Sequence, residues 1–321
     1  MKLTCLVDNA VQPSSGFWGE HGLAYLIETA GQRVLFDTGQ SGTVLAHNLE
    51  LLGIDPGVID AVAISHAHYD HTGGLPALLG RLRPGIPLYA SADLFRERFS
   101  QHEGTAKSIG LSLSQEELAG RLTLKLSAMP QEIAPGVWTT GEIVDRPKFE
   151  GRSSGHMMAA GGELVADAYR DDMSLVLVDG DRLALLCGCC HAGLLNTLAY
   201  VARTFAQPVI LIAGGLHLAG VSAAEMARTI ADLGGAEQIS VAHVAEAVQY
   251  RRAMAEVQVE AEAPGLLLPR GAHSHPSGSR SSSRRMRLAR PRPSAMCFGD
   301  GRASCQPSWR MSWPNVDRSR R

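Results

Sequence analysis

The chain has 321 residues, 45% of them apolar, so it can bury a full core as one large domain or two small ones. No stretch approaches the roughly 18 consecutive apolar residues of a membrane span, and the first residues lack the basic start and long hydrophobic run of a signal peptide. The six cysteines are unevenly spread and do not resemble a disulfide framework. We therefore expect a cytoplasmic protein with reduced thiols and no membrane partner.

The net charge of −2 conceals two very different segments. From residue 265 onward, twelve arginines and two acidic residues give +10, so residues 1–264 carry −12. The basic segment is rich in Ser, Pro and Gly and has no sustained helical or strand period. We predict a folded domain over residues 1–263 and a disordered Arg/Ser/Pro-rich tail over residues 264–321.

The tail has two interpretations. Clustered arginine is the usual electrostatic handle for nucleic acid, which would favour a nuclease, but the tail lacks a recognisable binding motif and the acidic body would repel a polyanion. Arginine also outnumbers lysine 26 to 4, as in a GC-rich coding region. A shift of reading frame between about His243 and Gly265 would yield the same composition.

In the first half of the acidic part, predicted strands give way to strands alternating with helices. The predicted strands are Leu3–Val7, Leu23–Glu28, Arg33–Phe36, residues 60–65 ("DAVAIS") and "IPLYA"; the predicted helices are Val44–Leu52, Leu75–Leu82 and one from Ala92.

The second half begins with a long connection over residues 141–173, followed by two apolar strands, "SLVLVD" and "RLALLCG", that flank the turn residues "GD". Such a turn predicts a hairpin. The later predicted elements are a helix over residues 193–202, strand "PVILIAGG", a helix over residues 222–233 and strand "QISVAH". This order predicts an α/β protein with a sheet-rich core covered by helices.

The stretch "AISHAHYDHTGG" places His66, His68, Asp70 and His71 within six residues, directly after a strand and before two glycines. Imidazole nitrogen and carboxylate oxygen suit zinc at about 2.0 to 2.2 Å and also suit iron or manganese. The first two histidines can turn toward one point and the following Asp and His toward a second. The spacing predicts two adjacent divalent metal ions, with zinc as the first choice.

Together with "LFDTG" some thirty residues upstream, this motif resembles the metallo-β-lactamase superfamily over about residues 1–243. The resemblance implies an αββα sandwich with its metals on loops at one edge of two packed sheets. "GFWGEHGLAYLIET", "CGCCHAGLLNTL" and "IAGGLHL" are similar to a subgroup of 7,8-dihydropterin-6-methyl-4-(β-D-ribofuranosyl)aminobenzene-5'-phosphate synthases and metal-dependent hydrolases.

The resemblance also implies the ligands. The first metal would be held by His66, His68 and His191, and the second by Asp70, His71 and His243. Asp37 follows a strand and would either orient a ligand or simply form the turn before Thr-Gly.

This sequence departs from the subgroup in two places. His243 is followed by Val-Ala-Glu instead of Cys-Thr-Gly, and no bridging aspartate is evident after the second cluster. Cys189, Cys190 and Asp172 are nearby candidates, although each thiol can equally be a buried apolar side chain.

Two metals imply a metal-bound hydroxide near neutral pH, and hence a hydrolase acting on a phosphoester, lactone or similar bond. Asp70 and His217 are the expected catalytic residues. The alternative is a transferase that joins a dihydropterin methyl group to an aminobenzene ribofuranosyl phosphate, as the subgroup name implies.

Substrate-contacting residues are expected above the metals. Residues 141–173 exceed the length of an idle loop and carry Arg146 and Lys148 among other cations, so they form either a cationic lid or an ordinary solvated loop. Glu20 and His21 match subgroup motifs and could reach substrate or metal. A cationic lid favours a small anionic substrate.

Overall fold

The computed structural model describes residues 1–12, 14–148, 151–218 and 229. The first sheet has six strands in the order β1-β2-β3-β4-β5-β8. Its strands are β1 (Lys2–Val7), β2 (Ala24–Thr29), β3 (Gln32–Phe36), β4 (Ala61–Ala63), β5 (Pro87–Ala90) and β8 (Thr123–Leu126). The second sheet has the order β15-β14-β13-β10-β9. Its strands are β9 (Gln131–Ala134), β10 (Val137–Thr139), β13 (Leu175–Asp179), β14 (Arg182–Cys187) and β15 (Val209–Gly214).

The two sheets pack face to face, because alternate side chains of their strands point toward the space between the sheets. Val34 and Phe36 of β3 lie in one apolar cluster with Ala184 of β14, whereas Leu35 belongs to a cluster on the outer face of the first sheet and Leu185 to one on the outer face of the second. Successive side chains of a strand point to opposite faces, so each strand contributes to two cores. Both sheets are therefore buried on both faces.

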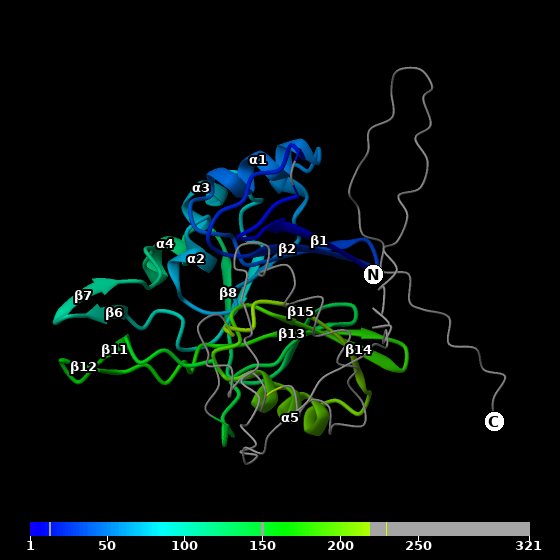
Figure 1. The fold of residues 1–321 in the computed structure, drawn as a ribbon. Helices are drawn as coiled ribbons and strands as arrows, with labels where there is room; N and C mark the ends of the chain where they lie inside the picture. Colours follow the sequence, from blue (N-terminus) through cyan, green and yellow to red (C-terminus); the bar gives the residue numbers. More distant parts are fainter. Residues whose placement is uncertain (13, 149–150, 219–228, 230–321) are drawn as a thin grey trace, which may run out of the picture. The chain divides into compact units, whose positions relative to one another are not determined.

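Helices cover the two outer faces (Figure 1). α1 (Thr43–Leu51) and α3 (Leu75–Leu79) pack Leu45 and Leu75 on the first sheet, and α5 (Leu194–Thr204) packs Leu198 on the second. The short helices are α2 (Tyr69–Thr72), α4 (Gln115–Ala119) and the 3-10 turn Pro56–Val58. The layer order confirms the predicted αββα sandwich.

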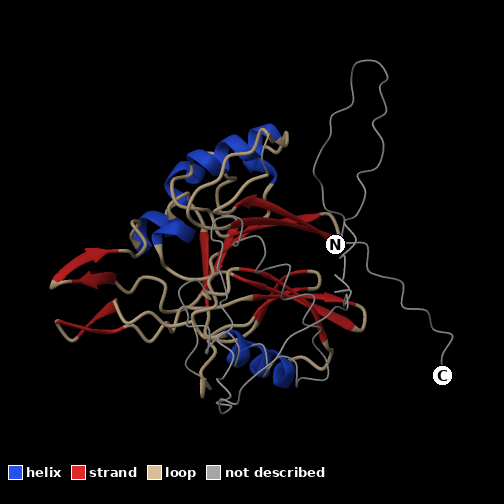
Figure 2. Ribbon diagram, viewed as in Figure 1, coloured by secondary structure: helices blue, strands red, loops and turns tan. Residues whose placement is uncertain are grey.

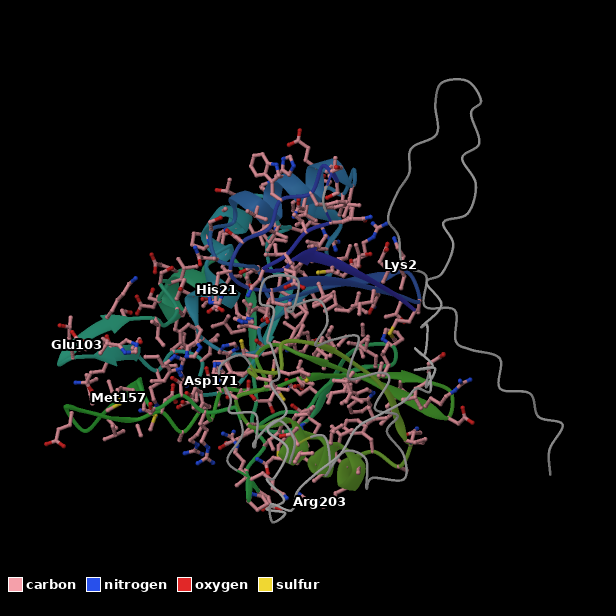
Figure 3. The ribbon with its side chains drawn as sticks, in the orientation of Figure 1. Lys2, His21, Glu103, Met157, Asp171 and Arg203 are labelled. Atoms are coloured by element: carbon pink, nitrogen blue, oxygen red, sulfur yellow. The ribbon has the colours of Figure 1, made fainter. Side chains whose placement is uncertain are left out.

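A third sheet of four strands, in the order β12-β11-β6-β7, lies apart from the two large sheets (Figure 2). It consists of β6 (Arg98–His102), β7 (Thr105–Ser108), β11 (His156–Ala160) and β12 (Glu163–Ala166). Glu103 and Met157 mark it in Figure 3. Part of the predicted loop over residues 141–173 is thus a hairpin paired with β6.

The predicted helix from Ala92 is wrong, because turns and then strand β6 occupy this segment. Ser91 Oγ accepts a hydrogen bond from Asp93 N, and β6 pairs with β11 more than fifty residues away. Long-range pairing therefore overrides the local helical pattern. α3 is also shorter than predicted, whereas the predicted hairpin at "GD" is confirmed as β13 and β14.

The predicted helix over residues 222–233, strand "QISVAH" and basic tail lie outside the described residues, apart from the helical position Thr229. No described helix has the length and apolarity that a membrane crossing requires.

Candidate metal centre

The clustered histidines follow the carboxyl ends of neighbouring strands. β3 and β4 are parallel, so Asp37 after β3 and His66 after β4 emerge at one edge of the first sheet. β14 ends at Cys187 in the facing sheet and leads to His191. The sandwich thus brings residues from three distant segments to one place.

The two glycines of "HTGG" allow the "DTG" loop to pack directly on the histidine cluster. A Cβ on Gly73 would lie 1.8 Å from Gln40 O, and one on Gly74 would lie 2.1 Å from Thr38 O. Thr38 N and Oγ1 both donate to His71 O, at 2.8 and 2.9 Å. Any side chain at these glycines would force the two loops apart.

Asp37 is fully buried and organises the cluster. Its Oδ1 accepts from Ser65 N at 2.7 Å, and its Oδ2 accepts from Ser65 Oγ and His71 Nδ1, each at 2.7 Å. Because Ser65 Oγ donates its proton to Asp37, it must accept from His66 Nδ1, which lies 2.8 Å away. Both histidines therefore use Nδ1 for these contacts and direct Nε2 toward the other donors of the cluster, an orientation typical of metal-binding imidazole.

The ring of His191 is also oriented by a contact through Nδ1. Its Nδ1 donates to Gly151 O at 2.7 Å, and its ring stacks on Tyr169 with centroids 4.4 Å apart and planes 10° apart. Its Nε2, like that of His68, is buried and has no hydrogen-bond partner among the described residues. An unpaired buried nitrogen is costly unless something binds it, so both atoms fit the role of metal ligands.

Three groups of donors could each hold an ion, because the ligand atoms within each group lie within 4.8 Å of one another. The groups are His66–Cys189–His191, His68–His156–His191 and Asp70–His71–Cys189. The predicted ligands from the first cluster and His191 are thus brought together, while His243 lies outside the described residues.

The charge states suit metal binding. Burial lowers the pKa values of His66, His68 and His191 well below the usual value for histidine, and the neighbouring histidines lower them further. These imidazoles are therefore neutral at pH 7, the form that coordinates a metal. Burial opposes ionisation of Asp70, but His71 above all lowers the pKa of Asp70 below its ordinary range.

His71 behaves differently from the other three histidines. Burial alone would lower its pKa, but Cys189, Asp70 and Asp37 outweigh burial and raise it well above the usual value. The second donor group is thus rich enough in negative charge to hold a proton on His71, and a divalent cation would satisfy the same charge.

His156 joins the site in a way that the sequence did not indicate, whereas Cys189 was already a candidate ligand. His156 belongs to β11 of the small sheet, its Nδ1 is buried without a hydrogen-bond partner in the described part of the chain, and its ring lies 4.9 Å from that of His68. Sequence reasoning placed it only in a cationic loop. The strand pairing of β11 with β6 carries it to the metal centre.

An arginine buried beneath the histidines was also missed. Arg98 is 0% exposed and pairs with Asp93 at 2.8 Å, Asp167 at 3.2 Å and Asp171 at 2.7 Å. Asp171, labelled in Figure 3, also accepts from Ala67 N at 2.7 Å, between the two histidines of "HAH". The ion-pair cluster therefore holds the backbone of the "HAH" loop in place through Asp171.

The predicted substrate residues lie around the site with differing contacts. Glu20 accepts from Gln40 N at 3.0 Å, Ser41 N at 3.1 Å and Ser41 Oγ at 2.6 Å, which ties down the loop after "DTG". His21 is 58% exposed, with Nε2 3.4 Å from Asp70 Oδ2.

The remaining predicted contacts come from the later part of the chain. Arg146 donates to three carbonyls, those of Ile143, Ala168 and Tyr169. The backbone of Lys148 is held by Asn196 at 3.0 and 2.9 Å. The ring of His217 lies 4.4 Å from that of His191. Roles of these side chains toward substrate stay predictions.

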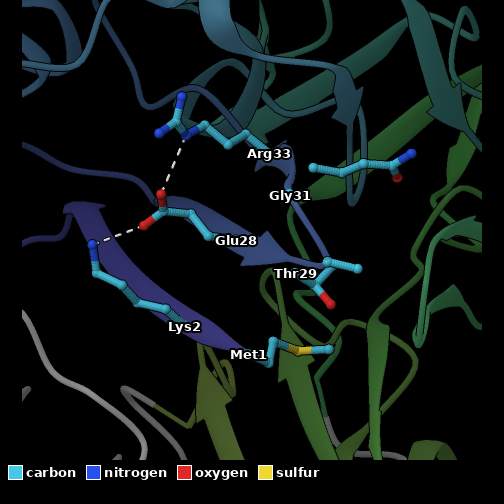
Figure 4. Close-up of a pocket in the computed structure, with 8 residues that line it drawn as sticks. Met1, Lys2, Glu28, Thr29, Gly31 and Arg33 are labelled. Atoms are coloured by element: carbon cyan, nitrogen blue, oxygen red, sulfur yellow. Dashed lines mark hydrogen bonds and ion pairs between the residues drawn. The ribbon is translucent and has the colours of Figure 1, made fainter.

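A pocket of about 610 Å³ lies at the other end of β3, around the β2–β3 turn (Figure 4). Glu28 pairs there with Lys2 at 2.7 Å and with Arg33 at 3.2 Å. The lining contains no histidine or cysteine. The clustered histidines therefore lie at the opposite end of β3 from this pocket.

With its sandwich fold and its metal-binding motif at the sheet edge, the chain belongs to the metallo-β-lactamase superfamily, whose family model matches residues 18–157. It is a metal-dependent enzyme of this fold. A short second match, to the C-terminal part of magnesium chelatase subunit ChlI, covers residues 221–251, of which only Thr229 is described.

Two known proteins are similar to this chain over most of its length, and a third is similar over a short segment. The 7,8-dihydropterin-6-methyl-4-(β-D-ribofuranosyl)-aminobenzene-5'-phosphate synthase of Methanocaldococcus jannaschii is 31% identical over 76% of this chain and 87% of its own length. The crystal structure of Tm1679, described as a metal-dependent hydrolase of the β-lactamase superfamily, is 28% identical with a TM-score of 0.62, covering 73% of this chain and 83% of that chain. Ribonuclease TTHA0252 of Thermus thermophilus is 44% identical over 22% of this chain and 16% of its own length.

Proposed function

We propose that this chain is a metal-dependent transferase that joins a dihydropterin methyl unit to an aminobenzene ribofuranosyl phosphate. The observation that carries the proposal is the similarity to the M. jannaschii synthase, which extends over 87% of that protein. In such a reaction the amine replaces a phosphate leaving group on the carbon attached to the pterin. Both substrates are anionic, in keeping with the expected cations around the site.

The residues divide into two tasks. As the family resemblance implies, His66, His68 and His191 would hold one ion, and Asp70 and His71 would hold the other. The donor groups that contain these residues also include Cys189 and His156. When bound, such ions supply Lewis acidity that stabilises negative charge developing on the leaving phosphate.

Asp70 is ionised at neutral pH because His71 lowers its pKa, so its carboxylate can accept a hydrogen bond from the incoming nucleophile. His217, beside His191, and His21, beside Asp70, would contact substrate from two sides of the centre. Asp37 orients the ring of His71 directly and that of His66 through Ser65 Oγ.

Hydrolysis is the second candidate, supported by the similarity to Tm1679. The two reactions differ only in the nucleophile, since water in place of the amine would release free hydroxymethylpterin. The same carboxylate and histidines would serve either reaction, so the site geometry favours both equally.

Product analysis separates the two. Purified, metal-loaded protein is supplied with a phosphorylated hydroxymethyl dihydropterin, with and without the aminobenzene ribofuranosyl phosphate. A coupled product supports transfer, and free hydroxymethylpterin in both mixtures supports hydrolysis and contradicts transfer. Turnover should disappear in His68→Ala and persist in His102→Ala, whose exposed histidine lies outside the three donor groups. Unchanged turnover in His68→Ala would contradict both candidates.

A nuclease role through the basic tail stays a prediction, because those residues lie outside the described part of the chain. Deleting residues 265–321 tests it directly. If RNA or DNA binding is the same with and without the tail, this role is refuted.

A further inference from the structure

Cys189 belongs to two of the three donor groups described above. It is the one residue shared by the group that contains His66 and His191 and the group that contains Asp70 and His71. Its Sγ lies 3.2 Å from His71 Nε2, and the residue is 9% exposed. A donor within 4.8 Å of both sets of ligands is placed to contact two ions at once.

The neighbouring cysteines point elsewhere. Cys190 has a φ of 60° and directs its Sγ toward Thr197 Oγ1, 3.5 Å away at the start of α5. Cys187 belongs to the apolar cluster beneath α5. Of the three thiols in "CGCC", the structure therefore gives only Cys189 to the metal centre.

The backbone holds Cys189 in this position. Gly188 has no side chain, and a Cβ there would lie 2.1 Å from Ser65 Oγ and 3.3 Å from Asp37 Oδ2. Gly188 O accepts from Gly215 N at 2.9 Å, which fixes the turn between β14 and the segment after β15. The bare glycine lets the chain pass close to the "SHAH" loop.

Repulsion between two metal ions gives a reason for an anionic sulfur at position 189. Two divalent ions at about 3.5 to 4 Å repel each other, and an anionic ligand between them reduces that repulsion. The three donor groups in the described residues include one carboxylate, that of Asp70. Asp172 is also buried, and its Oδ1 has no hydrogen-bond partner among the described residues. Its Oδ2 accepts from Ala192 N, however, and Asp172 is absent from all three groups.

We propose that Cys189 binds both metal ions as a bridging thiolate, in the place where a carboxylate would otherwise stand. The inference rests on the metal-dependent function proposed above. Binding breaks the S–H bond of the thiol, forms two metal–sulfur bonds and releases the proton to solvent. Thiolate is a strong ligand for zinc, at about 2.3 Å, and a softer one than carboxylate.

X-ray absorption at the zinc edge of the full-length, zinc-loaded protein tests the assignment. The wild type should show sulfur at about 2.3 Å from zinc together with nitrogen and oxygen ligands, and about two ions per chain. Cobalt-loaded wild type should show a thiolate-to-cobalt charge-transfer absorption. Cys189→Ser should lose the sulfur signal and the charge-transfer band, while the matched variant Cys190→Ser should keep both.

A further variant separates loss of the ligand from loss of the fold. Cys189→Asp offers a carboxylate at the same place, so it should bind about two ions per chain without a sulfur signal. A sulfur signal that is missing in the metal-loaded wild type, or that survives in Cys189→Ser, overturns the bridging thiolate and leaves the metal-dependent function standing. A wild-type protein that binds no metal overturns both.

Discussion

Asp37→Asn should weaken metal binding without unfolding the protein. Asparagine has the same shape, but it lacks the charge and replaces one acceptor oxygen with an NH₂ group. Asp37 accepts three hydrogen bonds at 2.7 Å, so at least one of the donors on Ser65 and His71 must then face a donor. His71 then loses the contact that orients its ring, and His66 is affected through Ser65 Oγ, which contacts both Asp37 and His66.

The expected loss follows from the role of Asp37. Replacing a partner that orients metal ligands typically costs 10- to 100-fold in metal affinity, which is about 1.4 to 2.7 kcal/mol. The affinity of purified protein for zinc is measured by competition with a chromophoric chelator, and far-ultraviolet circular dichroism checks the fold. Asp60→Asn is the matched control, because Asp60 precedes β4 and pairs with the exposed Arg83. Equal zinc affinity in Asp37→Asn and wild type would refute the reasoning.

Three further predictions follow from the packing. Gly188→Ala places a methyl group 2.1 Å from Ser65 Oγ, so urea unfolding should show a loss of about 1 to 3 kcal/mol and chelator competition a weaker metal affinity; unchanged values would contradict the close approach. Arg98→Met leaves buried carboxylates without their cation and should cost about 3 to 5 kcal/mol in urea unfolding, whereas a loss below 1 kcal/mol would contradict the buried ion pairs. Burial raises the pKa of Asp171 to about 7, so its stabilising contribution is full below the unfolded value near 4 and is lost as the pH rises through 7. The free energy of unfolding should fall over that interval relative to Asp171→Asn, and parallel pH profiles of the two proteins would refute this.

The sequence alone was enough for the class of fold and for the grouping of the first cluster of possible ligands. His66, His68, Asp70 and His71 lie within six residues, so their convergence follows from one strand end and one short helix. Strand alternation and the "GD" turn are likewise local signals, and they predicted β3, β13 and β14 within one or two residues. Motif spacing, strand alternation and turn residues can be recognised in the sequence without knowledge of tertiary contacts.

Only the tertiary structure decided which polar residues lie in the candidate metal centre. Two adjacent cysteines are equivalent in sequence, but the left-handed φ of Cys190 turns its thiol to Thr197, while Cys189 lies beside His71. His156 reaches the site because β11 pairs with β6, a contact across more than fifty residues. Arg98 is buried because three carboxylates compensate its charge, and two of them, on Asp167 and Asp171, come from a distant segment of the chain. Side-chain direction and charge compensation depend on partners far away in the chain, so the local pattern could not determine them.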